Sequence, residues 1–154
     1  MVTQTRIAWF LTLTILLVLS TVSCSTPSDE IQVIEVVDGD TIIIEGGSRV
    51  RYIGVDTPEI YPDIETYGID AWQANRGLVE GKKIHLEKDV SDTDKYGRLL
   101  RYVYVGNILI NAELVRLGLA KAKAYPPDIK YQKHLSRMEI EAKENRRGIW
   151  IQQK

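Results

Sequence analysis

Acidic and basic side chains gather in three short segments of this 154-residue sequence. The segments are 38–41 (Asp-Gly-Asp-Thr), 51–59 (Arg-Tyr-Ile-Gly-Val-Asp-Thr-Pro-Glu) and 93–98 (Thr-Asp-Lys-Tyr-Gly-Arg). Each has a plain structural explanation: Asp-Gly forms turns, proline ends strands, and an arginine after glycine is usually solvated. Together, however, they supply carboxylates and guanidinium groups, which are the groups that bind divalent cations and phosphates.

The carboxylates of Asp40 and Asp56 form a candidate metal site. Asp40 opens one predicted strand and Asp56 closes the next, so antiparallel pairing of these strands would bring the two acids together. Carboxylates about 4 Å apart repel by roughly 4 kcal/mol at an effective dielectric constant near 20, and a cation between them turns this repulsion into binding. With the carbonyl of Thr57 as a third hard oxygen, the set suits calcium or magnesium rather than zinc.

Three further side chains supply the other parts of a phosphodiester hydrolase. Arg51, on the strand expected to end at Asp56, is placed to bind a phosphate at the metal. Arg98, in the facing loop, offers a second guanidinium group, and Glu59 follows the metal site in a proline-bounded loop. This set provides charge neutralisation, stabilisation of the transition state and a carboxylate that orients or deprotonates water.

Short strands and amphipathic helices are expected to position these groups. The strand signals are rich in β-branched residues, and an Asp-Gly turn joins the first two of them. Strands are expected at 33–37, 41–45, 50–55, 83–90, 99–105 and 108–110, and helices at 69–80, 111–117 (capped by Asn111) and 128–146. Five or so strands with about three helices indicate an α+β fold, mainly β: a small barrel with helices packed beside it.

The three segments resemble those of the staphylococcal (micrococcal) nuclease family, the thermonucleases. The similarity runs from about residue 31 to residue 150, in the same order and with similar spacing, and includes 111–116 and 148–150. The resemblance implies a five-stranded OB-fold barrel with three helices. It also implies these roles: calcium ligands at Asp40, Asp56 and the Thr57 carbonyl, phosphate contacts from Arg51 and Arg98, and Glu59 as general base.

The implied reaction is calcium-dependent hydrolysis of DNA or RNA, with water attacking phosphorus and the 5′ P–O bond breaking to leave 3′-phosphate ends. Lys95 and Tyr96 match family residues that contact the terminal phosphate of a bound nucleotide. The alternative is a non-catalytic OB-fold module that only binds nucleic acid. A pure binder has no need of a metal-and-base set, so these residues favour the enzyme.

Two features depart from the family pattern. Where the family has a pair of tyrosines that pack on the nucleotide, this sequence has only Tyr125, and a lost stacking face weakens binding by about 1–3 kcal/mol. The loop 59–68 is shorter than in the family and carries Asp63 and Glu65 in place of lysines. Nearby negative charge is expected to slow the approach of a polyanion, so turnover is expected to be slower or more selective.

The N-terminal residues differ in character from the remainder of the chain. Residues 1–23 combine one positive charge, Arg6, with a short apolar run, which is the pattern of a signal peptide. Cys24 is the only cysteine in the sequence, and its surroundings resemble a bacterial lipoprotein signal. An ordinary signal peptide that contains a cysteine is the alternative. Residues 24–30 are expected to form a tether and 31–152 the folded domain.

Composition limits the functional classes. The formal net charge is −1, which argues against a protein that coats DNA non-specifically, because such proteins carry a strongly basic footprint. An enzyme that meets phosphates at one site needs only local positive charge. We therefore expect a monomeric, exported nuclease, lipid-anchored to the outside of a bacterial membrane or secreted, with nucleic acid as its substrate. A lipoprotein with a structural or adhesive role would not account for the three segments.

Overall fold

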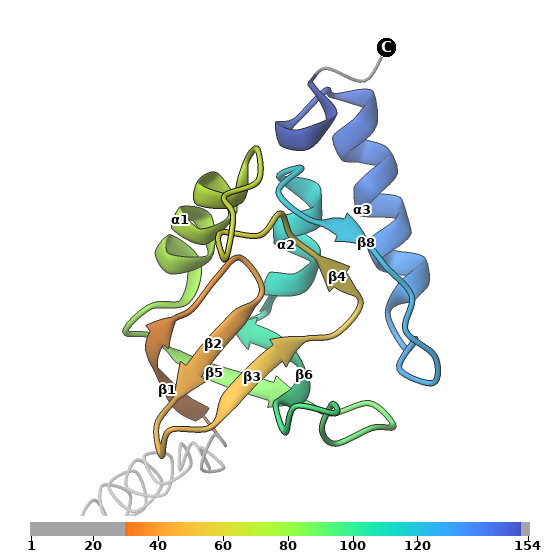
Figure 1. The fold of residues 1–154 in the computed structure, drawn as a ribbon. Helices are drawn as coiled ribbons and strands as arrows, with labels where there is room; N and C mark the ends of the chain where they lie inside the picture. The colour runs from red at the N-terminus through yellow and green to blue at the C-terminus, as the bar shows by residue number, and fades with distance from the viewer. Residues whose placement is uncertain (1–29, 152–154) are drawn as a thin grey trace, which may run out of the picture.

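Five strands close into a barrel in the computed structural model, which describes residues 30–151. They lie in the order β3-β2-β1-β5-β6, and a parallel pairing of β3 with β6 closes the circle (Figure 1). The barrel strands are β1 (Glu30–Val36), β2 (Thr41–Ile44), β3 (Arg49–Tyr52), β5 (Lys83–Glu87) and β6 (Leu99–Val105). The predicted mainly β, α+β architecture, a five-stranded OB-fold barrel, is confirmed.

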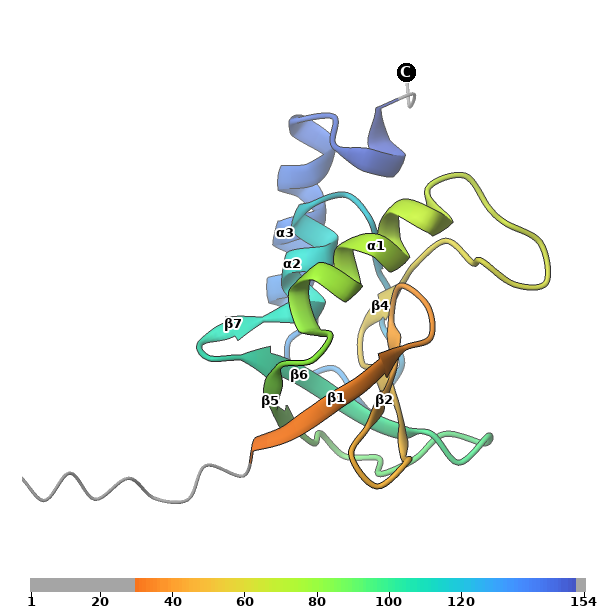
Figure 2. The same cartoon turned by 90° about the vertical axis from the view of Figure 1, so that its left-hand side faces the viewer.

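Three helices gather at one end of this barrel (Figure 2). They are α1 (Gly68–Val79), α2 (Ile110–Arg116) and α3 (Gln132–Glu144), followed by the 3₁₀ helix η1 (Gly148–Trp150). Three short strands complete the fold: β7 (Ile108–Leu109) extends the sheet beside β6, and β4 (Val55–Asp56) pairs with β8 (Lys121–Ala122). The helices cap the open end of the barrel, where the apolar interior would otherwise meet water.

The barrel interior is mainly aliphatic, and the alternation of side chains along each strand decides which of them face it. Each barrel strand contributes at least one residue that is no more than 1% exposed: Val33, Ile42, Val50, Ile84 and Val103. Because successive side chains on a strand point to opposite faces, burying Val50 and Tyr52 turns Arg51 to the outside of the barrel. The same pattern that builds the core therefore aims this arginine at the site.

The expected continuous strand 50–55 is wrong, because the chain turns sharply after β3. Gly54 has φ +77°, and a Cβ atom there would lie 2.5 Å from Leu135 Cδ1, so the turn requires glycine. The Ile53 N–H donates to the carbonyl of Arg101 at 3.0 Å, which fixes the turn against β6. Asp56 consequently lies on β4 and not on the strand of Arg51.

Asn111 does not cap α2, as the sequence predicted, but lies inside its first turn and is fully buried. Its side-chain oxygen accepts a hydrogen bond from the Val103 N–H at 2.9 Å, and its amide donates to the Ile53 carbonyl at 2.8 Å. The side chain thus ties α2 to β6 and to the turn after β3. A cap residue and a buried amide are indistinguishable in sequence, because both require a short polar side chain.

The last helix begins at Gln132 and not at Asp128, because Asp128 is engaged elsewhere. Its carboxylate accepts hydrogen bonds from the backbone N–H groups of Val90, at 3.0 Å, and Ser91, at 2.8 Å. Burial alone would raise the pKa of Asp128, but hydrogen bonding by the Ser91 side chain, together with these two backbone bonds, outweighs it and holds the pKa below its ordinary value. The side chain therefore fixes the loop after β5 against the segment that precedes α3.

The predictions for residues 1–23 and Cys24, and all of the tether except Glu30, fall outside the described residues. Within residues 30–151, no helix has the length and apolar character needed to cross a bilayer.

We predict that Asp128→Ala lowers the free energy of unfolding at pH 7 by about 1–3 kcal/mol, because two backbone donors lose their acceptor. The folded-state pKa is lowered, so the stabilisation is present above the ordinary value of 3.8 and is lost as the pH falls through the lower folded value. Urea denaturation from pH 7 to pH 3 measures the difference. Asp63→Ala, an exposed carboxylate, is the control. A loss that does not shrink in acid would contradict this account.

Candidate active site

The turn between β1 and β2 delivers Asp40 to the site. Gly39 lets this turn lie close to α1 and to the loop that precedes α1. A Cβ atom at this position would come within 2.6 Å of Thr57 Oγ1 and 2.9 Å of Ala71 Cβ. From α1, the buried Asn75 donates to the Asp38 carbonyl at 3.1 Å and accepts from the Tyr52 hydroxyl at 3.0 Å. The position of Asp40 thus depends on a packed helix as well as on its own turn.

The Asp40 carboxylate is almost completely buried, at 1% exposure for the residue. Its Oδ2 accepts the Thr57 N–H at 3.1 Å, and the Thr41 hydroxyl donates to Oδ1 at 3.4 Å. Its Oδ1 also forms an ion pair with the Arg51 guanidinium group. A carboxylate removed from water to this extent needs a positive partner, because burying an unpaired charge is costly.

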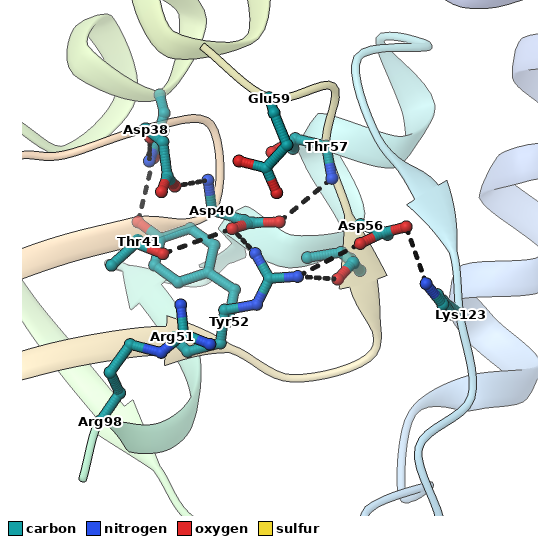
Figure 3. Close-up of polar contacts among 12 residues, drawn as sticks. Asp38, Asp40, Thr41, Arg51, Tyr52, Asp56, Thr57, Glu59, Arg98 and Lys123 are labelled. Atoms are coloured by element: carbon teal, nitrogen blue, oxygen red, sulfur yellow. Dashed lines mark hydrogen bonds and ion pairs between the residues drawn. The ribbon is translucent and has the colours of Figure 1, made fainter. Parts of the chain in front are cut away.

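Arg51 joins Asp40 to Asp56 (Figure 3). Its Nη1 pairs with Asp40, and its Nη2 lies 3.4 Å from Asp56 Oδ1 and donates to the Val55 carbonyl at 3.2 Å. The turn at Gly54 redirects the chain after β3, and Asp56 comes to lie near Asp40, the residue just before β2. The structure therefore brings the two acids together on a single guanidinium group, although Asp56 lies on a different strand from the one expected.

The same groups meet the chemical requirements of a divalent cation site. The carboxylates of Asp40 and Asp56 converge on the Arg51 guanidinium group, and their oxygens are hard ligands of the kind that a divalent metal ion binds. The hydrogen bond from the Thr57 N–H to Asp40 places the Thr57 backbone next to this carboxylate. Within the described residues, no group of three or more His, Cys, Asp and Glu side chains is arranged so that it could hold a metal ion by itself. The carboxylates of Asp40 and Asp56 are oxygen donors of the kind that calcium and magnesium prefer.

Glu59 reaches the site from the loop between β4 and α1. Figure 3 shows its carboxylate beside those of Asp38 and Asp40. Burial and then the negative charge of Asp38 raise the pKa of Glu59, while the charge of Arg51 opposes them. Two hydrogen bonds join the ends of the segment 59–65. The Glu65 carboxylate accepts a hydrogen bond from the Glu59 N–H at 3.1 Å, and the Glu65 N–H donates to the Glu59 carbonyl at 2.9 Å.

Arg98 comes from the loop before β6 and is fixed by Asp94. The Asp94 carboxylate accepts the Arg98 Nε–H at 2.7 Å and the backbone N–H groups of Tyr96, at 2.9 Å, and Arg98, at 3.0 Å. Because β3 pairs with β6, Arg98 lies beside Arg51, and both line a pocket of about 230 Å³. The two arginines thus share one cavity next to the paired acids.

The three predicted nucleotide-binding residues divide between the pocket and its surroundings. Tyr125 lines the pocket and is 42% exposed. Lys95 and Tyr96 lie outside its lining, with the Tyr96 ring 72% exposed and flanked by Lys95 Nζ at 4.9 Å and Arg98 Cζ at 5.6 Å from its centre. They form an exposed cationic and aromatic surface next to Arg98.

Sequence reasoning missed the residues that hold the functional side chains in place. Asp94 had a usable signal, since an aspartate followed by Gly and Arg at this spacing is typical of a turn whose acid accepts backbone N–H groups. Asn75 and the loop-closing role of Glu65 had none, because both depend on how α1 and the loop before it pack. Lys123 lies outside the three sequence segments, yet its Nζ lies 3.0 Å from Asp56 Oδ2.

The fold and the site define a small OB-fold barrel that presents two acids and two arginines around one cavity. The family model described as "Staphylococcal nuclease homologue" matches residues 49–152. The chain is 38% identical to the thermonuclease of Staphylococcus hyicus over 125 residues, which cover 77% of this chain and 74% of that protein. It is 43% identical to endonuclease YncB of Bacillus subtilis over 122 residues, covering 74% of this chain and 58% of YncB. The chain belongs to the staphylococcal nuclease family.

Proposed function

We propose that this protein is a nuclease that hydrolyses the phosphodiester bonds of DNA or RNA and depends on calcium. The observation that carries the proposal is the convergence of Asp40 and Asp56 on Arg51, beside a pocket that Arg51 shares with Arg98. Family membership and relatives that are named thermonuclease and endonuclease support it. A protein that only binds nucleic acid would not need two converging acids within reach of a carboxylate base.

In this proposal Asp40, Asp56 and the Thr57 carbonyl would hold a calcium ion, which when bound would supply positive charge to the phosphoryl oxygens. Arg51, which lines the adjoining pocket, binds the phosphate there. Arg98 binds the same phosphate from the loop before β6, and its hydrogen bond to Asp94 holds its side chain in place. Two forked donors at one phosphate are the arrangement that stabilises charge building up on its oxygens.

Glu59 acts as the general base. Its carboxylate stands next to the acid pair and accepts a proton from the water that attacks phosphorus. The hydrogen bonds to Glu65 hold this part of the loop in place, which limits the freedom of the base before reaction. Breaking the 5′ P–O bond leaves one product with a 3′-phosphate and the other with a 5′-hydroxyl group.

Residues 25–154 should degrade heat-denatured DNA when calcium is present and stop when it is chelated, with activity restored by added calcium. Release of acid-soluble nucleotides measures the rate, and the same assay with RNA compares the two substrates. A full rate in excess chelator would refute the metal assignment. Binding of DNA without cleavage at any calcium concentration would instead favour the non-catalytic OB-fold module.

Glu59→Gln should lower kcat by about 10²–10⁴, since it removes the proton acceptor and keeps the shape of the side chain. Asp63→Asn is the matched control, because it removes an exposed carboxylate from the same loop. The effect of that charge on substrate approach should appear in KM, so kcat should stay nearly unchanged. Circular dichroism of both variants checks the fold. A Glu59 variant that retains the wild-type kcat would show that another group takes the proton.

We further propose that the protein is exported and carries a lipid on Cys24, with residues 24–30 linking the membrane to the barrel. The support is the signal-like pattern of residues 1–23 and the absence of a second cysteine in the sequence. Labelled palmitate should be incorporated by the bacterial host into the wild type and not into Cys24→Ala. Label that persists in the variant would rule out attachment at this residue.

A further inference from the structure

Lys123 reaches the acid pair from outside the three sequence segments. It directly follows β8, whose pairing with β4 sets Asp56 opposite Lys121, and its backbone N–H donates to the Gly54 carbonyl at 2.9 Å. Its Nζ lies 3.0 Å from Asp56 Oδ2 (Figure 3). The strand pairing and this backbone hydrogen bond fix the position of the Lys123 backbone, so the fold itself places the lysine side chain near Asp56.

The two oxygens of Asp56 face different partners. Oδ1 lies toward Arg51 and, through it, toward Asp40, whereas Oδ2 faces Lys123. The lysine therefore holds the outer oxygen and leaves the inner one for a cation shared with Asp40. Its positive charge nevertheless stands close to any ion bound there, and like charges at short range repel.

Lys123 also borders the pocket that contains the two arginines. Its Nζ lies 5.4 Å from the centre of the Tyr125 ring, and Tyr125 lines that pocket with Arg51 and Arg98. The lysine side chain is 50% exposed, so its ammonium group is accessible to an anion in the pocket. A nucleic-acid backbone that enters beside Tyr125 would therefore lie near a third positive charge, Lys123, in addition to the two arginines.

We propose that Lys123 weakens cation binding and strengthens polyanion binding at the same site. This inference rests on the proposed nuclease function and adds a residue that lowers the affinity for the metal ion while raising the affinity for the nucleic acid. One charge produces both effects, because it repels the ion that the acids attract and attracts the phosphates that the arginines bind. Half-exposed ion pairs change equilibrium constants by up to about fivefold, and effects of that size are expected here.

Lys123→Met tests the inference, because methionine keeps much of the aliphatic stem and removes the charge. Titration calorimetry with calcium chloride alone should give a dissociation constant about two- to fivefold lower than that of the wild type. At saturating calcium, KM for heat-denatured DNA should rise by a similar factor. Lys123→Arg keeps the charge and should stay near the wild type in both measurements, as should Lys83→Met, which removes an exposed lysine from β5.

The two measurements separate this inference from the proposed function. Calcium affinity that is unchanged or weaker in Lys123→Met would overturn the inference, and weaker affinity would show that the lysine mainly orients Asp56. An unchanged KM would overturn the substrate half. Equal changes in Lys83→Met would show that net charge, and not the position of Lys123, is responsible. Failure of the wild type to bind calcium at all would overturn the proposed metal site together with this inference.

Discussion

The contact of one guanidinium group with two carboxylates is the interaction on which the site depends. Asp40 is buried, so its charge has to be balanced, and Arg51 balances it while also reaching Asp56. Removing one partner of a buried charge pair is far more costly than the pair is worth, because the remaining charge stays in a poor solvent. The surrounding structure, including the glycine turns and the packing of α1, places these three side chains where that balance is possible.

The class of fold and the acidic and basic residues of the candidate site could be predicted from the sequence, because both depend on local sequence patterns. Barrel strands alternate between core and solvent, so the β-branched runs around Val50 and Ile42 predict the strands, whereas the outward direction of Arg51 follows from the observed burial of Val50 and Tyr52. Turn residues such as Asp38 and Gly39 have local preferences that do not depend on the remainder of the chain. The fold prediction is confirmed for these reasons, whereas the roles of the site residues remain proposals.

What the sequence did not predict depends on contacts between distant segments. The break after β3 depends on Gly54, in the turn between β3 and β4, which lies close against Leu135 of the last helix. The two amides Asn75 and Asn111 are fully buried and hydrogen-bonded across elements, and an asparagine in sequence gives no sign of burial. Lys123 lies 67 residues from Asp56 along the chain, so only the β4–β8 pairing reveals that they meet.

The parallel seam between β3 and β6 makes the order of synthesis relevant to activity. Arg51 is carried by the first half of the barrel and Arg98 by the segment that leads into β6, so neither arginine has its neighbour until the circle closes. A nascent chain that ends within β5 contains both acids and Arg51 but not Arg98, so it lacks the cavity that the two arginines line. Under the proposed function, a chain that ends before Arg98 is therefore not expected to cleave nucleic acid.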